Sequence, residues 1–194
     1  MKYILVGTNR PQSNSRKVGE IIQKIYLDLN ETVEILDLKD FPFHELRGEL
    51  YGKALPQHVA DWIQKINHSE GLIIIVPEYN GSMPGALKYF IDFWSYPDAF
   101  EHRPVCMIGL GGMFGGLRPV EHLQQIFGYR NSFIFPDRVF LQNVWKVINA
   151  QGELTEKIAM ELLISQAKGF QAFCRALYAE KLDAYHLSLA RNKK

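Results

Sequence analysis

Cysteine is scarce in this sequence. Only Cys106 and Cys174 occur among its 194 residues, and they form no Cys-x-x-Cys pair. Both stand in apolar stretches, which is typical of small buried hydrophobic residues rather than of redox or metal-binding groups. The six histidines show no spacing of metal ligands either, so we predict no metal site. So few cysteines fit a reducing compartment, and we predict a cytoplasmic protein.

The chain also lacks an excess of charge and a long apolar run. Lys and Arg together number 22 against 21 Asp and Glu, which gives a formal net charge of +1. Nothing in this balance indicates long-range attraction to nucleic acid or to an acidic membrane. No run approaches the ~18 apolar residues that a membrane-spanning helix needs. The first residues read as a strand and not as a signal peptide.

Two common nucleotide-binding motifs are absent as well. Neither the Gly-x-Gly-x-x-Gly fingerprint of dinucleotide-binding folds nor the Walker Gly-Lys-Ser/Thr sequence occurs in the chain. Their absence argues against a Rossmann dinucleotide site and against an ATPase.

Short apolar runs alternate with helical patterns along the chain. We predict strands at residues 2–7, 32–38, 71–76, 105–108 and 132–135, the last of which could continue to Leu141. We predict helices at residues 15–29, around 59–66, after Pro84 and at 116–127, and a long final helix capped by Thr155. The inward positions of that final helix are Leu162, Leu163, Phe170, Phe173 and Leu177.

The run at residues 71–76 is apolar throughout after its glycine, which is typical of a strand covered on both faces in a parallel sheet. Five strands alternating with five helices predict an α/β fold over one domain, residues 1–194. Its core would be a doubly wound five-stranded parallel sheet with helices on both faces. In this architecture ligands bind outside the carboxyl ends of the strands, where the strand order reverses. The loops after the first, third and fourth strands should therefore carry the function.

The loop after the first strand is rich in groups that bind phosphate. It leads into a helix, whose N-terminal N–H groups and partial positive charge suit an anion. Hydroxyls and carboxamides can complete the oxygen shell, and a guanidinium can form charge-assisted hydrogen bonds. The candidate phosphate ligands are Thr8, Arg10, Ser13, Asn14 and Ser15. The alternative is a capped turn, although one hydroxyl would suffice for a cap.

The loop after the third strand has a backbone shaped by two prolines and two glycines. Such a loop can present N–H and C=O groups to the edge of a flat heterocycle. The candidate residues are Pro77, Glu78, Tyr79, Asn80 and Gly81. A plain strand-to-helix turn is the alternative.

Here the sequence resembles a known family. The stretch Pro-Glu-Tyr-Asn-Gly-Ser-x-Pro-Gly-x-Leu-Lys-x-x-x-Asp at residues 77–92 is similar to the signature of the flavodoxin-like NADPH-dependent FMN reductase family, which includes azoreductase-like and quinone-reductase-like members. The first loop resembles the phosphate loop of that family. The glycine-rich stretch at residues 109–116 resembles its flavin loop, although Gly109 stands where a serine is common. A flexible turn without function is the alternative for this third loop.

The resemblance implies FMN as the cofactor, NADPH or NADH as the electron donor and a small molecule as the acceptor. The residues of the first loop match the phosphate site, and residues 77–81 match positions that frame the isoalloxazine. Gly111, Gly112 and Gly115 match the loop at the other edge of the ring. Because the flavin carries the chemistry, we predict no catalytic side chain, and for Glu78 a framing role. The alternatives are a flavodoxin-type electron carrier and a flavin-binding regulatory protein without turnover.

We also predict a homodimer, with a tetramer as the further alternative. The helix after Pro84 carries aromatic residues on several faces, and a helix that is apolar nearly all round should be covered on both sides. These residues are Leu87, Tyr89, Phe90, Ile91, Phe93, Trp94 and Tyr96. The resemblance likewise implies dimers that pack through this region. Lys88 and Asp92, four positions apart, would then flank the contact, and a surface ion pair is the alternative for them. In a monomer, the long final helix would have to cover these aromatic residues.

Overall fold

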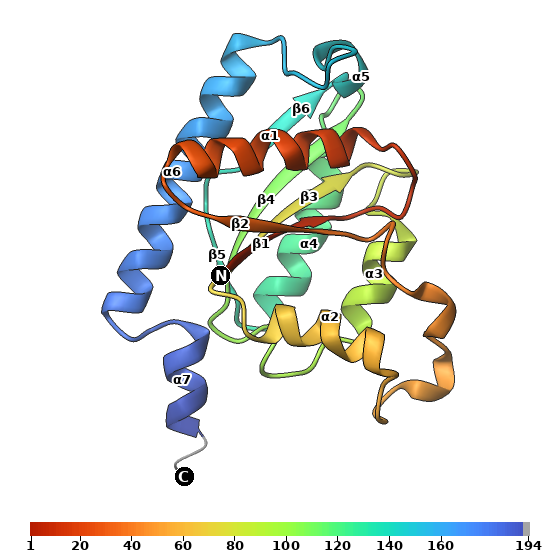
Figure 1. Cartoon of the computed structure of the whole chain (residues 1–194), viewed down its shortest axis with the longest axis vertical. Helices are drawn as coiled ribbons and strands as arrows, with labels where there is room; N and C mark the ends of the chain where they lie inside the picture. Colours follow the sequence, from red (N-terminus) through yellow and green to blue (C-terminus); the bar gives the residue numbers. More distant parts are fainter. Residues whose placement is uncertain (192–194) are drawn as a thin grey trace.

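The computed structural model describes residues 1–191, and its centre is one parallel sheet (Figure 1). The strands are β1 (Lys2–Val6), β2 (Val33–Asp37), β3 (Gly71–Pro77), β4 (Pro104–Gly111), β5 (Phe133–Ile134) and β6 (Val139–Gln142). Their order is β2-β1-β3-β4-β5, and β6 also pairs with β4. This is the order of flavodoxin-like folds, in which the chain reverses its direction of winding between β1 and β3. The predicted fold class is confirmed.

The fifth position of the sheet holds two short strands instead of one. β5 pairs with the beginning of β4 at Pro104 and Val105, whereas β6 pairs with its end, from Ile108 onward. Pro136 lies between them, and proline can donate no hydrogen bond to a strand ladder. The predicted continuation to Leu141 therefore exists, but it is interrupted.

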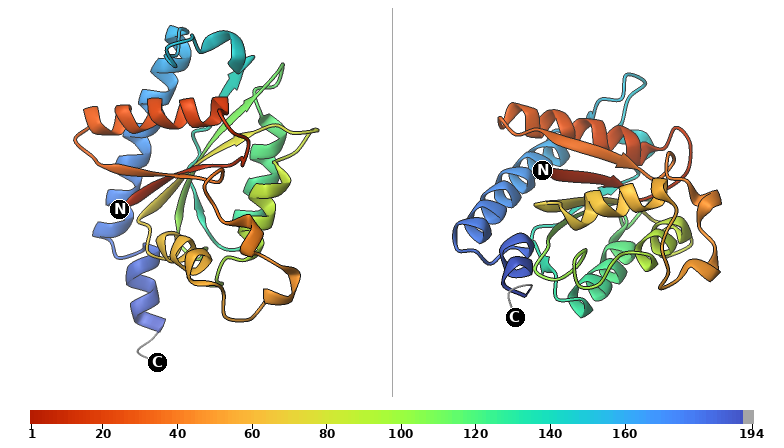
Figure 2. Two further views of the ribbon diagram at one scale, coloured as in Figure 1. Left: turned by 45° about the vertical axis from the view of Figure 1, so that its right-hand side comes forward. Right: turned by 60° about the horizontal axis from the view of Figure 1, so that its bottom comes forward.

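Helices cover both faces of the sheet (Figures 1 and 2). The α-helices are α1 (Asn14–Asp28), α2 (Gln57–Asn67), α3 (Gly85–Asp92), α4 (Leu117–Tyr129), α5 (Val144–Val147), α6 (Lys157–Ala179) and α7 (Ala184–Arg191), and two 3₁₀ turns, η1 (Phe43–Glu45) and η2 (Gly48–Leu50), precede α2. One core cluster joins α2, α3 and α4 to the sheet, and a second joins α1 and α6 to the opposite face. β3 is buried by both clusters, which explains its uninterrupted apolar sequence.

The long final helix differs in detail from the prediction. It begins at Lys157, and the predicted cap Thr155 instead donates from its hydroxyl to the Val147 carbonyl at 3.1 Å. Leu163 is fully buried as predicted, but Leu162 is 52% exposed, so its predicted inward position is wrong. The short helices α5 and α7 were not predicted.

Most of the aromatic residues in α3 and directly after it are covered by their own chain. Tyr51, from the segment between β2 and α2, stacks on Phe93 with the ring centroids 4.1 Å apart. The Tyr89 hydroxyl donates to the Leu46 carbonyl of the same segment at 3.3 Å. Phe93 and Trp94 therefore need no second molecule to bury them, and the alternative that the final helix covers these residues is wrong. Tyr96 remains 52% exposed, and the homodimer stays a prediction.

Leu162 and Leu163 provide a matched pair of substitutions. Leu163→Ala should lower the free energy of unfolding by about 2–5 kcal/mol, because it removes a buried side chain and leaves a cavity. Leu162→Ala should change it by no more than about 0.5 kcal/mol, because the side chain already faces solvent. Urea titrations followed by circular dichroism at one fixed flavin concentration would measure both values. Equal losses in the two variants would contradict this orientation of α6.

Candidate functional site

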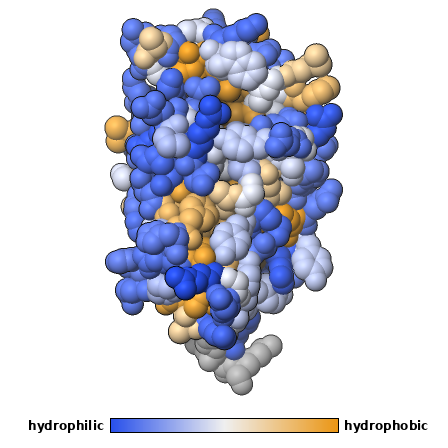
Figure 3. Space-filling view, turned by 90° about the vertical axis from the view of Figure 1, so that its right-hand side faces the viewer, coloured by the Kyte–Doolittle hydropathy of each residue, from blue (hydrophilic) through white to orange (hydrophobic). Residues whose placement is uncertain are grey.

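The loops after β1, β3 and β4 meet at the carboxyl edge of the sheet. Figure 1 shows the three strands running toward this edge, and Figure 3 views the molecule from that side. The edge includes the point between β1 and β3 where the strand order reverses, which is where open α/β sheets bind ligands. The structure thus brings together all three groups of predicted site residues.

The first loop presents the N-terminus of α1. Ser13 caps this helix, since its hydroxyl accepts from the Arg16 N–H at 3.1 Å. Thr8 is fully buried, and its hydroxyl accepts from the Arg10 N–H at 3.2 Å. Arg10 itself is exposed. The capped-turn explanation is correct for Ser13, but it leaves Thr8 and Arg10 unexplained.

A side-chain hydrogen bond ties the first loop to the second. The hydroxyls of Thr8 and Tyr79 lie 2.8 Å apart, although 71 positions separate them in the chain. Tyr79 therefore stands next to the predicted phosphate loop as well as in the predicted ring-framing loop. Sequence patterns do not reveal this contact, because it depends on how β1 and β3 pair.

The tip of the second loop is a tight turn. Tyr79 and Ser82 exchange two backbone hydrogen bonds of 2.8 and 3.1 Å. Asn80 and Gly81 between them have φ angles of 52° and 78°, as a type I′ turn requires, and Asn-Gly is a preferred pair for that turn. The turn alone accounts for these two residue types, and it fixes where the backbone of the loop points.

An ion pair joins the second loop to α4. Arg118 Nη1 lies 3.1 Å from Glu78 Oε1, and the Arg118 guanidinium lies 4.9 Å from the centre of the Phe114 ring. Glu78 is thus engaged with a cation, which agrees with a framing role better than with that of a base. Arg118 was missed by the sequence analysis, because nothing in its local sequence points toward Glu78.

Backbone packing shapes the glycine-rich third loop. A Cβ atom on Gly109 would lie 2.7 Å from the Gly115 carbonyl oxygen, and one on Gly116 would lie 2.5 Å from the Leu110 nitrogen. No side chain fits at either position, so this loop requires glycine at both. Gly111 and Gly115 are also closely packed, whereas a Cβ on Gly112 would meet only Trp145, at 3.6 Å. Gly112 is therefore the glycine of this loop that a ligand can approach.

None of the buried titratable groups described here supplies a reactive nucleophile. Burial raises the pKa of the Cys174 thiol to about 12 and raises the pKa of Cys106 as well, so both thiols stay protonated and inert. Burial also raises the pKa of Asp37 at the end of β2, while the Lys39 N–H and Arg16 act in the opposite direction. Among residues 1–191 no cluster of potential metal ligands occurs, and no helix is long and apolar enough to cross a membrane.

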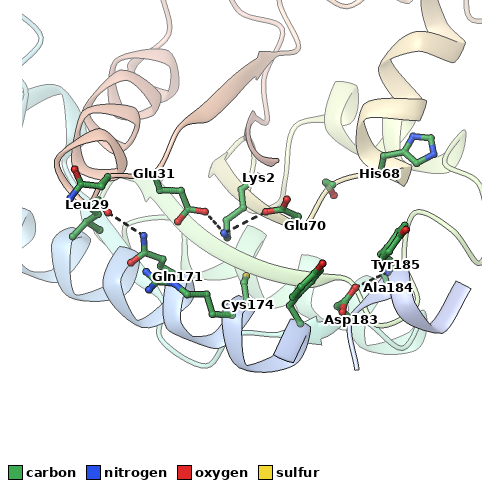
Figure 4. Close-up of a pocket in the computed structure, with 14 residues that line it drawn as sticks. Lys2, Leu29, Glu31, His68, Glu70, Gln171, Cys174, Asp183, Ala184 and Tyr185 are labelled. Atoms are coloured by element: carbon green, nitrogen blue, oxygen red, sulfur yellow. Dashed lines mark hydrogen bonds and ion pairs between the residues drawn. The ribbon is translucent and has the colours of Figure 1, made fainter. Parts of the chain in front are cut away.

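A cavity of about 770 Å³ lies away from these loops, where β1 and β3 begin (Figure 4). The Lys2 ammonium in its floor is buried, pairs with Glu31 and lies 4.0 Å from Glu70. The Gln171 amide donates to the Leu29 carbonyl at 3.4 Å. These polar groups largely satisfy one another, so the cavity offers no anion site comparable to the α1 N-terminus.

Comparisons with known proteins show which family the chain resembles. The family model of NADPH-dependent FMN reductases matches residues 3–146. The chain is 29% identical to an NAD(P)H-dependent FMN reductase of Pseudomonas aeruginosa, covering 75% of this chain and 80% of that protein. It is 28% identical to a quinone reductase of Escherichia coli, covering 87% and 92%. The solved structure of FerB, a flavoenzyme NAD(P)H:(acceptor) oxidoreductase from Paracoccus denitrificans, superposes with a TM-score of 0.74 at 22% identity, covering 90% and 97%.

Proposed function

The chain belongs to the NADPH-dependent FMN reductase family, and we propose that FMN binds where β1, β3 and β4 end. The chain is an NAD(P)H-dependent flavin oxidoreductase, and the family implies FMN as its cofactor. Relatives that reduce quinones suggest a quinone or a similar small acceptor as the final substrate. The observation that carries the proposal is the convergence of the three loops, tied by the hydrogen bond between Thr8 and Tyr79.

The residues of the first loop fit a single terminal phosphate. The N–H groups at the start of α1 and its partial positive charge suit a dianion. The hydroxyls of Thr8 and Ser15 and the amide of Asn14 would complete the oxygen shell, and Arg10 would add a charge-assisted hydrogen bond. With one such loop and no dinucleotide fingerprint, the chain should prefer FMN to FAD.

The second and third loops would frame the isoalloxazine through their backbone. Pro77, Glu78 and Tyr79 would face one edge of the ring, and the open backbone at Gly112 would face another. When bound there, FMN would supply the hydride and electron transfer between the nicotinamide and the acceptor. The chain would orient the ring and exclude water from it, and no side chain needs to act as an acid or a base. Glu78, paired with Arg118, would hold the loop in position.

The reaction gives a direct test. We expect protein loaded with FMN to oxidise NAD(P)H when a quinone is supplied, and initial-rate lines at several quinone concentrations to be parallel. The reason is that donor and acceptor would take turns at one exposed face of the ring. Intersecting lines would contradict a shared site. Bound FMN without NAD(P)H oxidation would favour an electron carrier, and failure to take up FMN would favour a regulatory protein.

Arg10 tests the phosphate site. Arg10→Ala should weaken FMN binding about 10- to 150-fold, because it removes a charge-assisted hydrogen bond of about 1.5–3 kcal/mol. Arg175→Ala is the matched control, since Arg175 lines the cavity at the opposite edge of the sheet. Titration of the apoprotein with FMN, followed by flavin fluorescence, gives both dissociation constants. Equal affinity of the Arg10 variant and the wild type for FMN would contradict the proposal that the first loop binds the phosphate.

We also propose that two copies of the chain pack through a groove between α3 and α4. The groove measures about 490 Å³, and its lining includes Met83, Ile91, Ile126 and the exposed Tyr129. Lys88 and Asp92 form an ion pair of 2.6 Å at its border, where charge can fix the register of two copies.

Sedimentation tests this assembly. The wild type should have about twice the chain mass of 22.3 kDa, and Tyr129→Asp should shift it toward the monomer. Tyr178→Asp, on α6, is the control, because Tyr178 is exposed but lies outside the groove. Phe93→Asp would be a poor test, because Phe93 is buried against Tyr51. A wild-type monomer at micromolar concentration would overturn the proposal.

A further inference from the structure

Three large apolar side chains are exposed in the third loop and at the adjacent start of α5. Met113 is 75% exposed, Phe114 48% and Trp145 58%. A single exposed apolar residue needs no explanation, but a group of them at a candidate site marks a contact surface. Apolar side chains also appear at the upper end of the face in Figure 3, the end at which Figure 1 places α5. We call these three residues the apolar rim.

Trp145 is held in place although it faces solvent. The Asn143 N–H donates to the Gly112 carbonyl at 3.2 Å, which ties the start of α5 to the third loop. Val144, the next residue, is buried in the core. The indole ring lies 3.6 Å from where a Cβ of Gly112 would be. The indole therefore packs against the side of Gly112 where a Cβ would point, and the rest of the indole surface stays exposed to a ligand.

Phe114 is also positioned by its neighbours. The Arg118 guanidinium contacts the Phe114 ring at 4.9 Å and forms the ion pair with Glu78. This charge is therefore compensated, and the surface around the ring carries no free cation from Arg118. A neutral ligand suits such a surface better than an anion does.

We propose that the apolar rim binds the electron acceptor and selects neutral, planar acceptors with fused aromatic rings, such as naphthoquinones. The proposal rests on the proposed function, and it adds which residues of this chain choose the acceptor. Planar rings gain from stacked and edge-to-face contacts with Phe and Trp, and the flexible thioether of Met113 can adapt to rings of different outline. Acceptors without a ring would gain nothing from these contacts.

The test compares two acceptors that draw on the same reduced flavin. Protein loaded with FMN is reduced chemically without oxygen and mixed with either 1,4-naphthoquinone or ferricyanide, while flavin absorbance is followed. Each reduced flavin supplies two electrons, which convert one naphthoquinone to its hydroquinone, with two protons, or two ferricyanide ions to ferrocyanide. Trp145→Ala should slow reoxidation by naphthoquinone about 3- to 10-fold and change reoxidation by ferricyanide less than about 2-fold. Tyr178→Ala, which removes an equally exposed ring on α6, should change neither.

Binding gives a second readout that does not depend on turnover. A redox-inactive hydroxycoumarin should perturb the flavin spectrum of the oxidised protein, and Trp145→Ala should weaken its binding by a similar factor while leaving the affinity for FMN unchanged. Equal effects on both acceptors, or none on naphthoquinone, would overturn the role of the rim. A wild type that is inert toward NAD(P)H would overturn the proposed function alone, because the chemically reduced protein still tests the rim. A wild type that does not bind FMN would overturn both.

Discussion

The structure depends on the burial of β3 from both sides. Its residues from Leu72 to Val76 are almost fully inaccessible to solvent, so the strand is stable only when helices cover both faces of the sheet. Parallel neighbours satisfy this requirement, because each crossover places a helix on one face or the other. The same connections bring the carboxyl ends of β1, β3 and β4 to one edge. The convergence of the loops is therefore a consequence of how the core is covered.

Within that edge, the loops are held mainly by backbone. The Gly7 N–H donates to the Ile75 carbonyl at 2.8 Å, and the Glu78 N–H donates to the Leu110 carbonyl at 2.8 Å. Each of these bonds joins the end of one strand to its neighbour. Two side-chain links, from Thr8 to Tyr79 and from Glu78 to Arg118, then connect the loops to each other and to α4. A ligand that enters would meet groups already fixed in place, which lowers the ordering cost of binding.

Sequence patterns predicted the parts that depend on local chemistry. The apolar run of β3 indicated a strand covered on both faces, as the structure confirms. The flavin-facing role of the third-loop glycines stays a prediction. The Asn-Gly pair at residues 80 and 81 also had a local reason, the type I′ turn. Sequence patterns failed where tertiary contacts determine which side chain is buried or which residues meet. Leu162 and Leu163 are chemically identical, and only the packing of α6 shows which one is buried. Tyr51 covers α3 from a segment without periodicity, and Arg118 finds Glu78 across 40 positions.

The close backbone contact between Gly109 and Gly116 fixes the path of the third loop independently of the side chains at its tip. The path of the third loop is set by main-chain atoms that touch directly, so Met113 and Phe114 at its tip contribute little to that path. Under the proposed function, substitutions at those two positions would change the contacts to the acceptor while the path of the loop stays the same. Gly109 and Gly116 would tolerate almost no change, and the tip would tolerate a great deal. Single substitutions at the tip would then change the choice of oxidant without any change in the backbone that holds the loop.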